Sequence, residues 1–412
     1  MTSKITILLS AYACRPNAGT EPGIGWNWAV HLAEAGSTVH VLTAGRNREG
    51  IEAYQREHPS SELHFHFIDV PWLNPMESGA RHYLVWQWTA LRRAKALVKS
   101  ISFDIVQHVS YGSVHLPTPL WRLGVPTIFG PVGGGQTTPP GLLPYFGDQI
   151  RNERRRTRIT QLLPHLPPYR KAMRRMSLVL AANSNTLELV RRAGCKRVEL
   201  LCDTGLRTDF YANSSRTFST AAPLRLLWVG RFLPRKGVEL ALDALQQASS
   251  DIHLTLVGDG QEETSLRNLI AKRGLEKRVS WAGRRLPWLE VREAYLDHDA
   301  LLFTSLRDTF GSQILEAMSL GLPVIALNLN GARDFIPPGA GVKVDVGDTV
   351  EETRQNLSSA LNRFASMTIE ERNAMSEVAW SKSQSCAWPK RAAFTLELFQ
   401  ELLHQKNKVQ QA

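Results

Sequence analysis

Two carboxylate side chains, Asp308 and Glu316, stand eight residues apart in the stretch SLRDTFGSQILEAMSLGLPVIALN, on either side of a turn that contains a glycine. A carboxylate repels phosphate but accepts hydrogen bonds well from paired hydroxyl groups, such as those of a ribose. Backbone N–H groups at the start of a helix, here those of Ser312 and Gln313, bind phosphate oxygens. The pattern therefore predicts a site for a molecule with hydroxyl groups at both ends and anions between them, which describes a nucleotide sugar.

The surrounding residues predict the elements that hold the two acids. Residues 300–305 are an apolar run typical of a buried strand, and Ser312 is a good N-cap for a helix over residues 313–320. Glu316 then lies one turn into this helix, with its side chain leaning back toward the helix N-terminus. The same pattern also fits a simpler arrangement, in which Glu316 is on a solvated helix surface and Asp308 only caps the helix.

Two cations follow another apolar run, residues 224–229, in the segment VGRFLPRKG. Arg231 offers a planar fork of donors and Lys236 a point charge, so together they can neutralise a diphosphate. The alternative for this pair alone is a solvated basic turn.

Glycine-containing turns follow several other expected strands and allow a ligand to approach the backbone closely. The first lies in GTEPGIGW before a helix, another in LVGDG, and a third in AGRRLP. Taken singly, each motif fits a plain strand–helix turn equally well. The candidate ligand-binding residues, including those of the acid-containing stretch, are Gly23, Gly25, Gly258, Gly260, Arg284, Phe310, Gly311, Ser312, Gln313 and Glu316.

The order of the elements predicts an α/β protein with two Rossmann-like domains that face each other across an interdomain cleft. Continuous apolar runs alternate with helical patterns in both halves of the chain, which indicates two parallel sheets with helices on both faces. Ligands bind at the carboxyl ends of such strands. We expect an N-terminal domain over residues 1–203, a polar linker over 204–222 and a C-terminal domain over 223–387.

The composition is that of a soluble globular protein with an anionic partner. The chain has 412 residues, 43% of them hydrophobic, and a formal net charge of +11. Its four cysteines are scattered without a CxxC pair, so neither a zinc site nor a disulfide framework is indicated. No apolar run reaches the length of a membrane span, and we expect a cytoplasmic protein.

Cations are concentrated in two segments, residues 81–99 and Arg151 to Arg175. Both segments mix cations with apolar residues, so they fit binding to an anionic membrane surface or to a lipid diphosphate. Solvated helices with a core-facing aromatic side are the alternative. Nucleic acid is not an expected partner, because the charge is local and no known binding module is present.

The spacing of Asp308 and Glu316, with Phe310 and Gly311 inside it and LEAMSLGLPVIA after it, resembles the E-x7-E signature of glycosyltransferase family four (group 1). This family comprises retaining enzymes with the GT-B fold. The resemblance extends over nearly the whole chain and includes VGRFLPRKG, LVGDG and the C-terminal segment AWPKRAAFTLELFQELL. Two departures are Asp308 in place of the family's Glu, which shortens the side chain by about 1.5 Å, and LCDTGLRTDFY at the hinge.

The resemblance implies a hexosyltransferase that moves a sugar from a UDP- or GDP-sugar, with retention, to a glycan or lipid-linked glycan in bacterial polysaccharide or lipopolysaccharide biosynthesis. The implied catalytic residues are His108 near the donor sugar, Asp308, Arg231 and Lys236. The last two stabilise the leaving diphosphate, so neither a metal nor another cofactor is expected. A helix over residues 388–405 is expected to pack back onto the N-terminal domain. For such a chain, the inner face of the cytoplasmic membrane is a possible location.

Two other functions remain open at this point. A GT-B sugar-nucleotide 2-epimerase shares the cleft but needs no separate acceptor, and it should lack the Arg and Lys loop paired with the two acids. A nucleotide-sugar binding protein without turnover is the third candidate, because Asp308 departs from the family pattern. As a lone histidine, His108 also fits a structural role.

Overall fold

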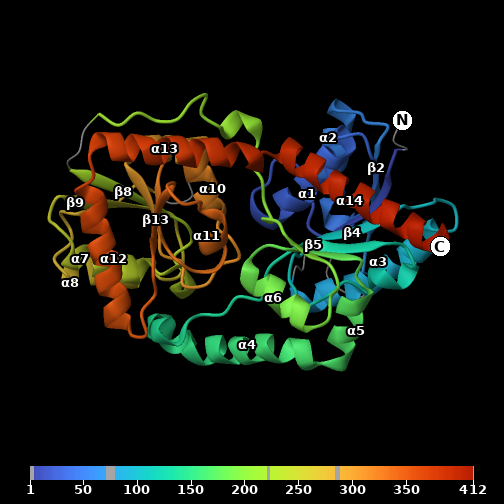
Figure 1. Ribbon diagram of the computed structural model, residues 1–412, viewed down its shortest axis with the longest axis horizontal. Helices are drawn as coiled ribbons and strands as arrows, with labels where there is room; N and C mark the ends of the chain where they lie inside the picture. Colours follow the sequence, from blue (N-terminus) through green and yellow to red (C-terminus); the bar gives the residue numbers. More distant parts are fainter. Residues whose placement is uncertain (1–3, 71–78, 220–222, 284–287, 412) are drawn as a thin grey trace. The chain divides into compact units, whose positions relative to one another are not determined.

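A computed structural model describes residues 4–70, 79–219, 223–283 and 288–411. The chain divides into two compact units. Unit 1 comprises Met1–Gly135, Thr160–Gly205 and Trp388–Ala412, and unit 2 comprises Gln136–Ile159 and Leu206–Ala387. Each unit contains one parallel sheet with helices between its strands, which confirms the expected pair of Rossmann-like domains (Figure 1).

Unit 1 is built on a seven-stranded sheet with the order β3-β2-β1-β4-β5-β6-β7. Its strands are β1 (Thr6–Ala11), β2 (Thr38–Ala44), β3 (Leu63–Ile68), β4 (Ile105–Ser110), β5 (Thr127–Val132), β6 (Leu178–Ala181) and β7 (Val198–Leu200). Its α-helices are α1 (Thr20–Glu34), α2 (Arg48–Glu57), α3 (Ala80–Leu97), α5 (Pro167–Arg175), α6 (Ser184–Arg192) and α14 (Trp388–Gln411), and its 3-10 helices are η1 (Gly45–Asn47), η2 (Pro119–Leu123) and η4 (Leu163–His165).

Helices cover both faces of this sheet. Successive residues of a strand point to opposite faces, and in β1 they contact different helices. Ile7 of β1 packs in one apolar cluster with residues of α1 and α14. The neighbouring Leu8 packs in a second cluster with residues of α3. Helix α14 lies against α1, where the rings of Trp28 and Trp388 meet edge to face with centroids 5.4 Å apart. The C-terminal helix thus packs on unit 1.

Unit 2 is built on a six-stranded sheet with the order β10-β9-β8-β11-β12-β13. Its strands are β8 (Leu224–Val229), β9 (Ile252–Val257), β10 (Val279–Trp281), β11 (Ala300–Phe303), β12 (Val324–Leu327) and β13 (Gly341–Val344). Its α-helices are α7 (Val238–Gln247), α8 (Glu263–Lys272), α9 (Trp288–Leu296), α10 (Ser312–Ser319), α11 (Asn330–Phe335), α12 (Val350–Ala365) and α13 (Ile369–Ser383), and its 3-10 helices are η3 (Pro140–Gln149), η5 (Thr208–Phe210), η6 (Pro234–Lys236) and η7 (Gln384–Cys386). Helix α4 (Ile150–Leu162) begins in unit 2 and ends in unit 1.

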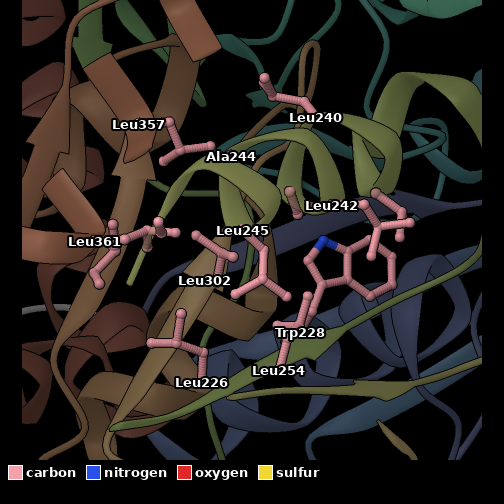
Figure 2. Packing of buried hydrophobic residues seen from close by; sticks show 14 of the residues in the cluster. Leu226, Trp228, Leu240, Leu242, Ala244, Leu245, Leu254, Leu302, Leu357 and Leu361 are labelled. Atoms are coloured by element: carbon pink, nitrogen blue, oxygen red, sulfur yellow. The ribbon is translucent and has the colours of Figure 1, made fainter. Parts of the chain in front are cut away.

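The core of unit 2 is formed by leucines of α7 and α12 that pack onto strands β8, β9 and β11. Figure 2 shows these side chains together with the indole ring of Trp228. The labelled core residues are Leu226, Trp228, Leu240, Leu242, Ala244, Leu245, Leu254, Leu302, Leu357 and Leu361. This packing holds fixed the strand ends from which the candidate site residues emerge.

The units differ from the expected division in two places. Residues 136–159, expected in the first domain, belong to unit 2. Within the segment expected as a linker over 204–222, residues 206–219 pack instead onto unit 2: Phe210 and Phe218 are buried, and the backbone N–H of Arg216 donates to the Ser376 hydroxyl. The segment is polar overall but contains scattered aromatic residues. Burial of a few aromatic rings is enough to fix such a segment on a domain, which explains the difference. Among the described residues, no helix is both long and apolar enough to cross a lipid bilayer.

Candidate functional site

The two predicted residues Lys236 and Asp308 form an ion pair in unit 2. The Asp308 carboxylate also lies 3.8 Å from the guanidinium of Arg235, and it accepts a hydrogen bond from the backbone N–H of Thr309 at 3.0 Å. Burial alone raises the pKa of a carboxyl, but Lys236 and Arg235 outweigh it and leave the pKa of Asp308 below its ordinary value. The carboxylate is therefore ionised at neutral pH.

The pair forms because β8 and β11 are neighbours in the sheet. Lys236 ends the short helix η6 after β8, and Asp308 lies in the loop after β11. The segments that follow these two strands are hydrogen-bonded to each other, since the Thr304 hydroxyl donates to the carbonyl oxygen of Gly237 at 2.8 Å. Gly237 has a φ of +67°, and a Cβ there would lie 2.2 Å from the carbonyl oxygen of Thr304. Only glycine at this position allows the segments after β8 and β11 to approach each other this closely.

Glu316 lies on α10 with its carboxylate partly buried. It accepts a hydrogen bond from the Tyr295 hydroxyl at 2.7 Å. Burial raises the pKa of Glu316, while the hydroxyls of Tyr295 and Ser312 and the charge of Lys236 act in the opposite direction. Two predicted acids and one predicted cation thus gather in one region of unit 2.

The start of α10 differs from the expectation in one respect. Ser312 is the first helical residue, and the N-cap is Gly311, which has no side chain to bond the free N–H groups. Gly311 has a φ of +96°, and a Cβ there would lie 2.4 Å from the ring of Phe303, so this ring excludes any other residue. The side-chain oxygen of Gln313 is buried and has no hydrogen-bond partner among the described residues. The N–H groups of the first turn of α10 therefore have no side-chain cap.

Phe310 is part of the core rather than of a ligand-facing surface. Its ring is buried and meets the ring of Phe335 edge to face, with centroids 5.2 Å apart.

The glycines of the LVGDG turn are explained by close packing of the backbone. Gly258 and Gly260 have φ angles of +148° and +157°. Cβ atoms at these positions would lie 1.8 Å from the carbonyl oxygen of Gly230 and 2.4 Å from that of Phe232. Arg231, between those two residues, is exposed. Arg284 lies outside the described residues.

The catalytic residue predicted in unit 1, His108, lies in the core of the protein. His108 is fully buried, with one ring nitrogen 2.9 Å from the Ser10 hydroxyl and the other 2.8 Å from the Tyr83 hydroxyl. Burial lowers the pKa of His108 to about 4. Since both nitrogens are already bonded in the core, this arrangement favours the structural role over contact with a donor sugar.

Gly23 and Gly25 lie in α1 rather than in a loop before it. Cβ atoms there would lie 2.0 Å and 2.1 Å from the carbonyl oxygens of Ala18 and Ala13. These glycines let the helix pack tightly on the loop that precedes it.

Several residues that surround the acids were not predicted. Arg235 adjoins Lys236 in the same cationic turn, so the sequence contained a signal for it. Tyr295 carried no such signal, because an aromatic residue in a helical pattern most often only fills the core. Gln136 donates to the Thr309 hydroxyl at 3.2 Å, and Glu153 pairs with Arg307 at 2.7 Å. These contacts join segments more than 150 residues apart, and no local pattern indicates them.

Known proteins are similar to this chain in sequence, chiefly over unit 2. Residues 215–380 match the family described as glycosyl transferases group 1. Over 144 residues, the chain is 36% identical to a lipopolysaccharide 1,6-galactosyltransferase of Salmonella typhimurium; the alignment covers 34% of this chain and 40% of that relative. The chain thus spans about two-fifths of the length of that protein.

Solved structures share the fold over nearly the whole chain. Sucrose-phosphate synthase from Thermosynechococcus elongatus has a TM-score of 0.69 and 17% identity, with 98% of this chain and 100% of that one covered. The Anabaena protein HepE, in complex with UDP and glucose, has a TM-score of 0.59 and 18% identity, with 96% and 100% covered. The expected GT-B fold is confirmed by these structures, and the family resemblance by the sequence match. The chain therefore has the GT-B fold, and its residues 215–380 are similar to the group 1 glycosyltransferases.

Proposed function

We propose that this protein is a retaining glycosyltransferase that moves a hexose from a UDP- or GDP-sugar to a glycan or a lipid-linked glycan in bacterial polysaccharide or lipopolysaccharide biosynthesis. The observation that carries the proposal is the Lys236–Asp308 ion pair with Glu316 beside it in unit 2. A cation for a diphosphate and acceptors for hydroxyl groups on both sides of it match the chemistry of a nucleotide sugar.

In this proposal, catalysis is mainly stabilisation of the leaving diphosphate. Lys236 has three N–H donors, so it can keep one on Asp308 and direct others to phosphate oxygens. Arg231 and Arg235 lie in the same turn and add positive charge as the anomeric bond breaks. These side chains supply what a divalent cation would otherwise supply, and we propose turnover without a metal.

The two acids have different partners in the proposal. Glu316 accepts hydrogen bonds from the ribose hydroxyls, and its bond from Tyr295 orients the carboxylate. Asp308, held ionised by Lys236 and Arg235, accepts hydrogen bonds from hydroxyls of the transferred sugar. The departing phosphate accepts the proton of the acceptor hydroxyl on the same face of the sugar, which gives retention.

Product analysis tests the proposal. Thermal shift with UDP-, GDP- and ADP-sugars identifies the donor, and a radiolabelled donor is then incubated with extracts of lipid-linked glycans, with and without EDTA. Transfer to a glycan with the donor's anomeric configuration, unaffected by EDTA, is expected. Conversion of the donor to its 2-epimer without acceptor would identify an epimerase, and binding without any product would identify a non-catalytic protein.

We also propose a peripheral position on the inner face of the cytoplasmic membrane. On helix α4, Arg154, Arg155 and Arg158 are exposed, and Ile159 and Leu162 on the same face are 44% and 57% exposed. Cations next to exposed apolar side chains on one helix face are typical of a segment that lies on anionic lipid.

A further inference from the structure

Residues 136–159, here called the brace, come from the first half of the sequence but pack into unit 2. Leu142, Tyr145 and Phe146 are buried in the same apolar cluster as α7 and strands β8 and β9. The Tyr145 hydroxyl donates to the Asp243 carboxylate on α7 at 2.8 Å. Helix η3 of the brace also lies against η6, the turn that ends in Lys236. The brace is thus anchored on the elements that carry the candidate site.

The brace holds the loop of Asp308 on both sides of that residue. On one side, Arg307 forms an ion pair with Glu153 at 2.7 Å, and the Glu153 side chain is only 4% exposed. On the other side, the side-chain amide of Gln136 donates to the Thr309 hydroxyl at 3.2 Å. Each immediate neighbour of Asp308 therefore bonds to a different end of the brace.

Glu153 and Gln136 are themselves held in place within the brace. Glu153 accepts a hydrogen bond from the Thr138 hydroxyl at 2.8 Å, and Arg156 donates to the carbonyl oxygen of Gln136 at 2.9 Å. These bonds restrict the two brace residues before they contact the loop. A side chain that is already restricted loses little further freedom when it bonds another group, so it positions that group well.

The charges around Glu153 make its carboxylate necessary for this arrangement. Burial, together with the nearby charges of Arg307 and Arg235, lowers the pKa of Arg156 to about 10, while Glu153 acts in the opposite direction. Glu153 thus supplies the negative charge next to Arg307 and Arg156. Without its charge, Arg307 and Arg156 would repel each other, and the loop of residues 305–311, which contains Arg307, would move away.

We propose that Glu153 and Gln136 are positioning residues for Asp308: they fix the loop of residues 305–311 so that its carboxylate stays on Lys236 and faces the sugar of the donor. This inference rests on the proposed function for its catalytic consequence, but not for the contacts themselves. It separates two tasks, because the brace bonds the loop of Asp308, whereas the Glu316 carboxylate accepts its hydrogen bond from Tyr295 of α9.

The test compares Glu153→Gln and Gln136→Met with the control Tyr145→Phe. Glu153→Gln keeps the size of the side chain but removes the charge that holds Arg307. Gln136→Met removes the donor to Thr309 and keeps the backbone carbonyl that Arg156 uses. Tyr145→Phe removes one hydrogen bond of the same brace, to α7, and leaves both contacts with the loop unchanged.

The experiment measures three quantities in wild type and in each variant. These are the amide hydrogen exchange of residues 305–311, the Kd values for UDP and GDP, and the turnover of the best donor. A hydrogen bond to a charged group contributes about 1.5–3 kcal/mol, so Glu153→Gln should speed exchange in the loop about tenfold or more and lower kcat by a similar factor. Gln136→Met should give a smaller effect, about fivefold. Both should leave the nucleoside diphosphate Kd within about twofold, and Tyr145→Phe should leave loop exchange and kcat unchanged.

Unchanged loop exchange in both variants would overturn the inference, as would a rise in the nucleoside diphosphate Kd as large as the fall in kcat. An equal effect of Tyr145→Phe on loop exchange would also overturn it, because the brace would then act only through stability. If wild-type protein transfers no sugar from any donor, the proposed function fails, while exchange and nucleotide binding still decide whether the brace positions the loop. If Glu153→Gln does not fold, Gln136→Met alone decides the same question.

Discussion

Lys236 and Asp308 lie 72 residues apart in the chain and form an ion pair in which both side chains are largely buried. The pair joins a residue expected to bind phosphate with one expected to bind a sugar hydroxyl. A donor that enters this site must share Lys236 with Asp308. The phosphate site and the sugar site of the proposed enzyme are therefore in direct electrostatic contact, and a change in either residue alters the charge of the other's surroundings.

Lys236→Ala should remove most of the turnover and leave the fold intact. Loss of one group aimed at charge that develops in the transition state typically lowers the rate on the order of 10²-fold. The measurement is kcat and KM for the best donor, with circular dichroism to check the fold. Lys236→Arg is the matched control, since it keeps the charge and should keep part of the activity. Values of kcat and KM within about threefold of wild type would contradict a role for Lys236 at the diphosphate.

Asp308→Asn should lower turnover while barely changing the affinity for free nucleoside diphosphate, which carries no hexose. A hydrogen bond to a charged group contributes about 1.5–3 kcal/mol, so the loss in turnover should be about tenfold or more. Isothermal titration with nucleoside diphosphate and with intact donor separates the two effects. Asp308→Glu restores the family's longer acid and should alter the preference among donor sugars. Equal losses for both ligands would show that Asp308 does not face the sugar.

Glu316→Gln should raise the Kd for nucleoside diphosphate and for the whole donor alike, by about tenfold or more. Glutamine replaces one acceptor oxygen with a donor, so it cannot accept from two ribose hydroxyls, and its amide also faces the Tyr295 hydroxyl. Tyr295→Phe is the control, since it removes that hydroxyl and keeps the carboxylate. A Glu316→Gln protein that binds nucleoside diphosphate as wild type does would place the ribose elsewhere.

Stability should fall between pH 6.5 and pH 4 because of His108. Burial lowers the pKa of His108 to about 4 in the folded protein, while the unfolded chain has the ordinary value of 6.5. Above pH 6.5 neither state is protonated there; as the pH falls, the unfolded state takes up a proton first and becomes more stable relative to the folded state. At pH 5 this amounts to about 2 kcal/mol. Urea denaturation at pH 7.5 and pH 5 measures it.

His108→Gln is the matched variant for that experiment. It loses the titrating group and should be less stable at pH 7.5, since it disturbs the bonds to Ser10 and Tyr83. Its stability should nevertheless change about 2 kcal/mol less between the two pH values than that of wild type. The same pH dependence in both proteins would assign the effect to other groups, such as His66, whose pKa is also lowered to about 4, by burial and by nearby His40, Arg93 and His64.

Replacement of Arg154, Arg155 and Arg158 by glutamine should weaken binding to vesicles that contain anionic lipid. Each cation near such a surface contributes about 1 kcal/mol, so the three should change the partition coefficient about 100-fold at low salt. Arg156 is left unchanged because it is partly buried and bonds to the carbonyl oxygen of Gln136. Sedimentation with vesicles is the measurement.

The control for the vesicle experiment replaces Arg191, Arg192 and Lys196, three exposed cations at the end of α6 and just after it. This triple variant has the same net charge as the first. If both variants lose the same affinity, the membrane responds to net charge rather than to α4, and if neither does, the α4 cations are a solvated surface.

Local patterns were sufficient to predict the two parallel sheets and the helix–strand order, because apolar periodicity and turn residues act over short stretches of chain. They also singled out Asp308, Glu316 and Lys236, which lie in the segments after β11 and β8. The family resemblance implied that His108 lies near the donor sugar, and the sequence could not show that Ser10 and Tyr83 bond both of its ring nitrogens.

Long-range packing was needed for the rest. The assignment of residues 136–159 to unit 2 and the ion pair of Glu153 with Arg307 depend on contacts between segments far apart in the chain. So does the pairing of β8 with β11, which brings Lys236 to Asp308. Such contacts form only when apolar clusters from distant segments are buried together, and a single sequence contains no local signal for which of its clusters will meet.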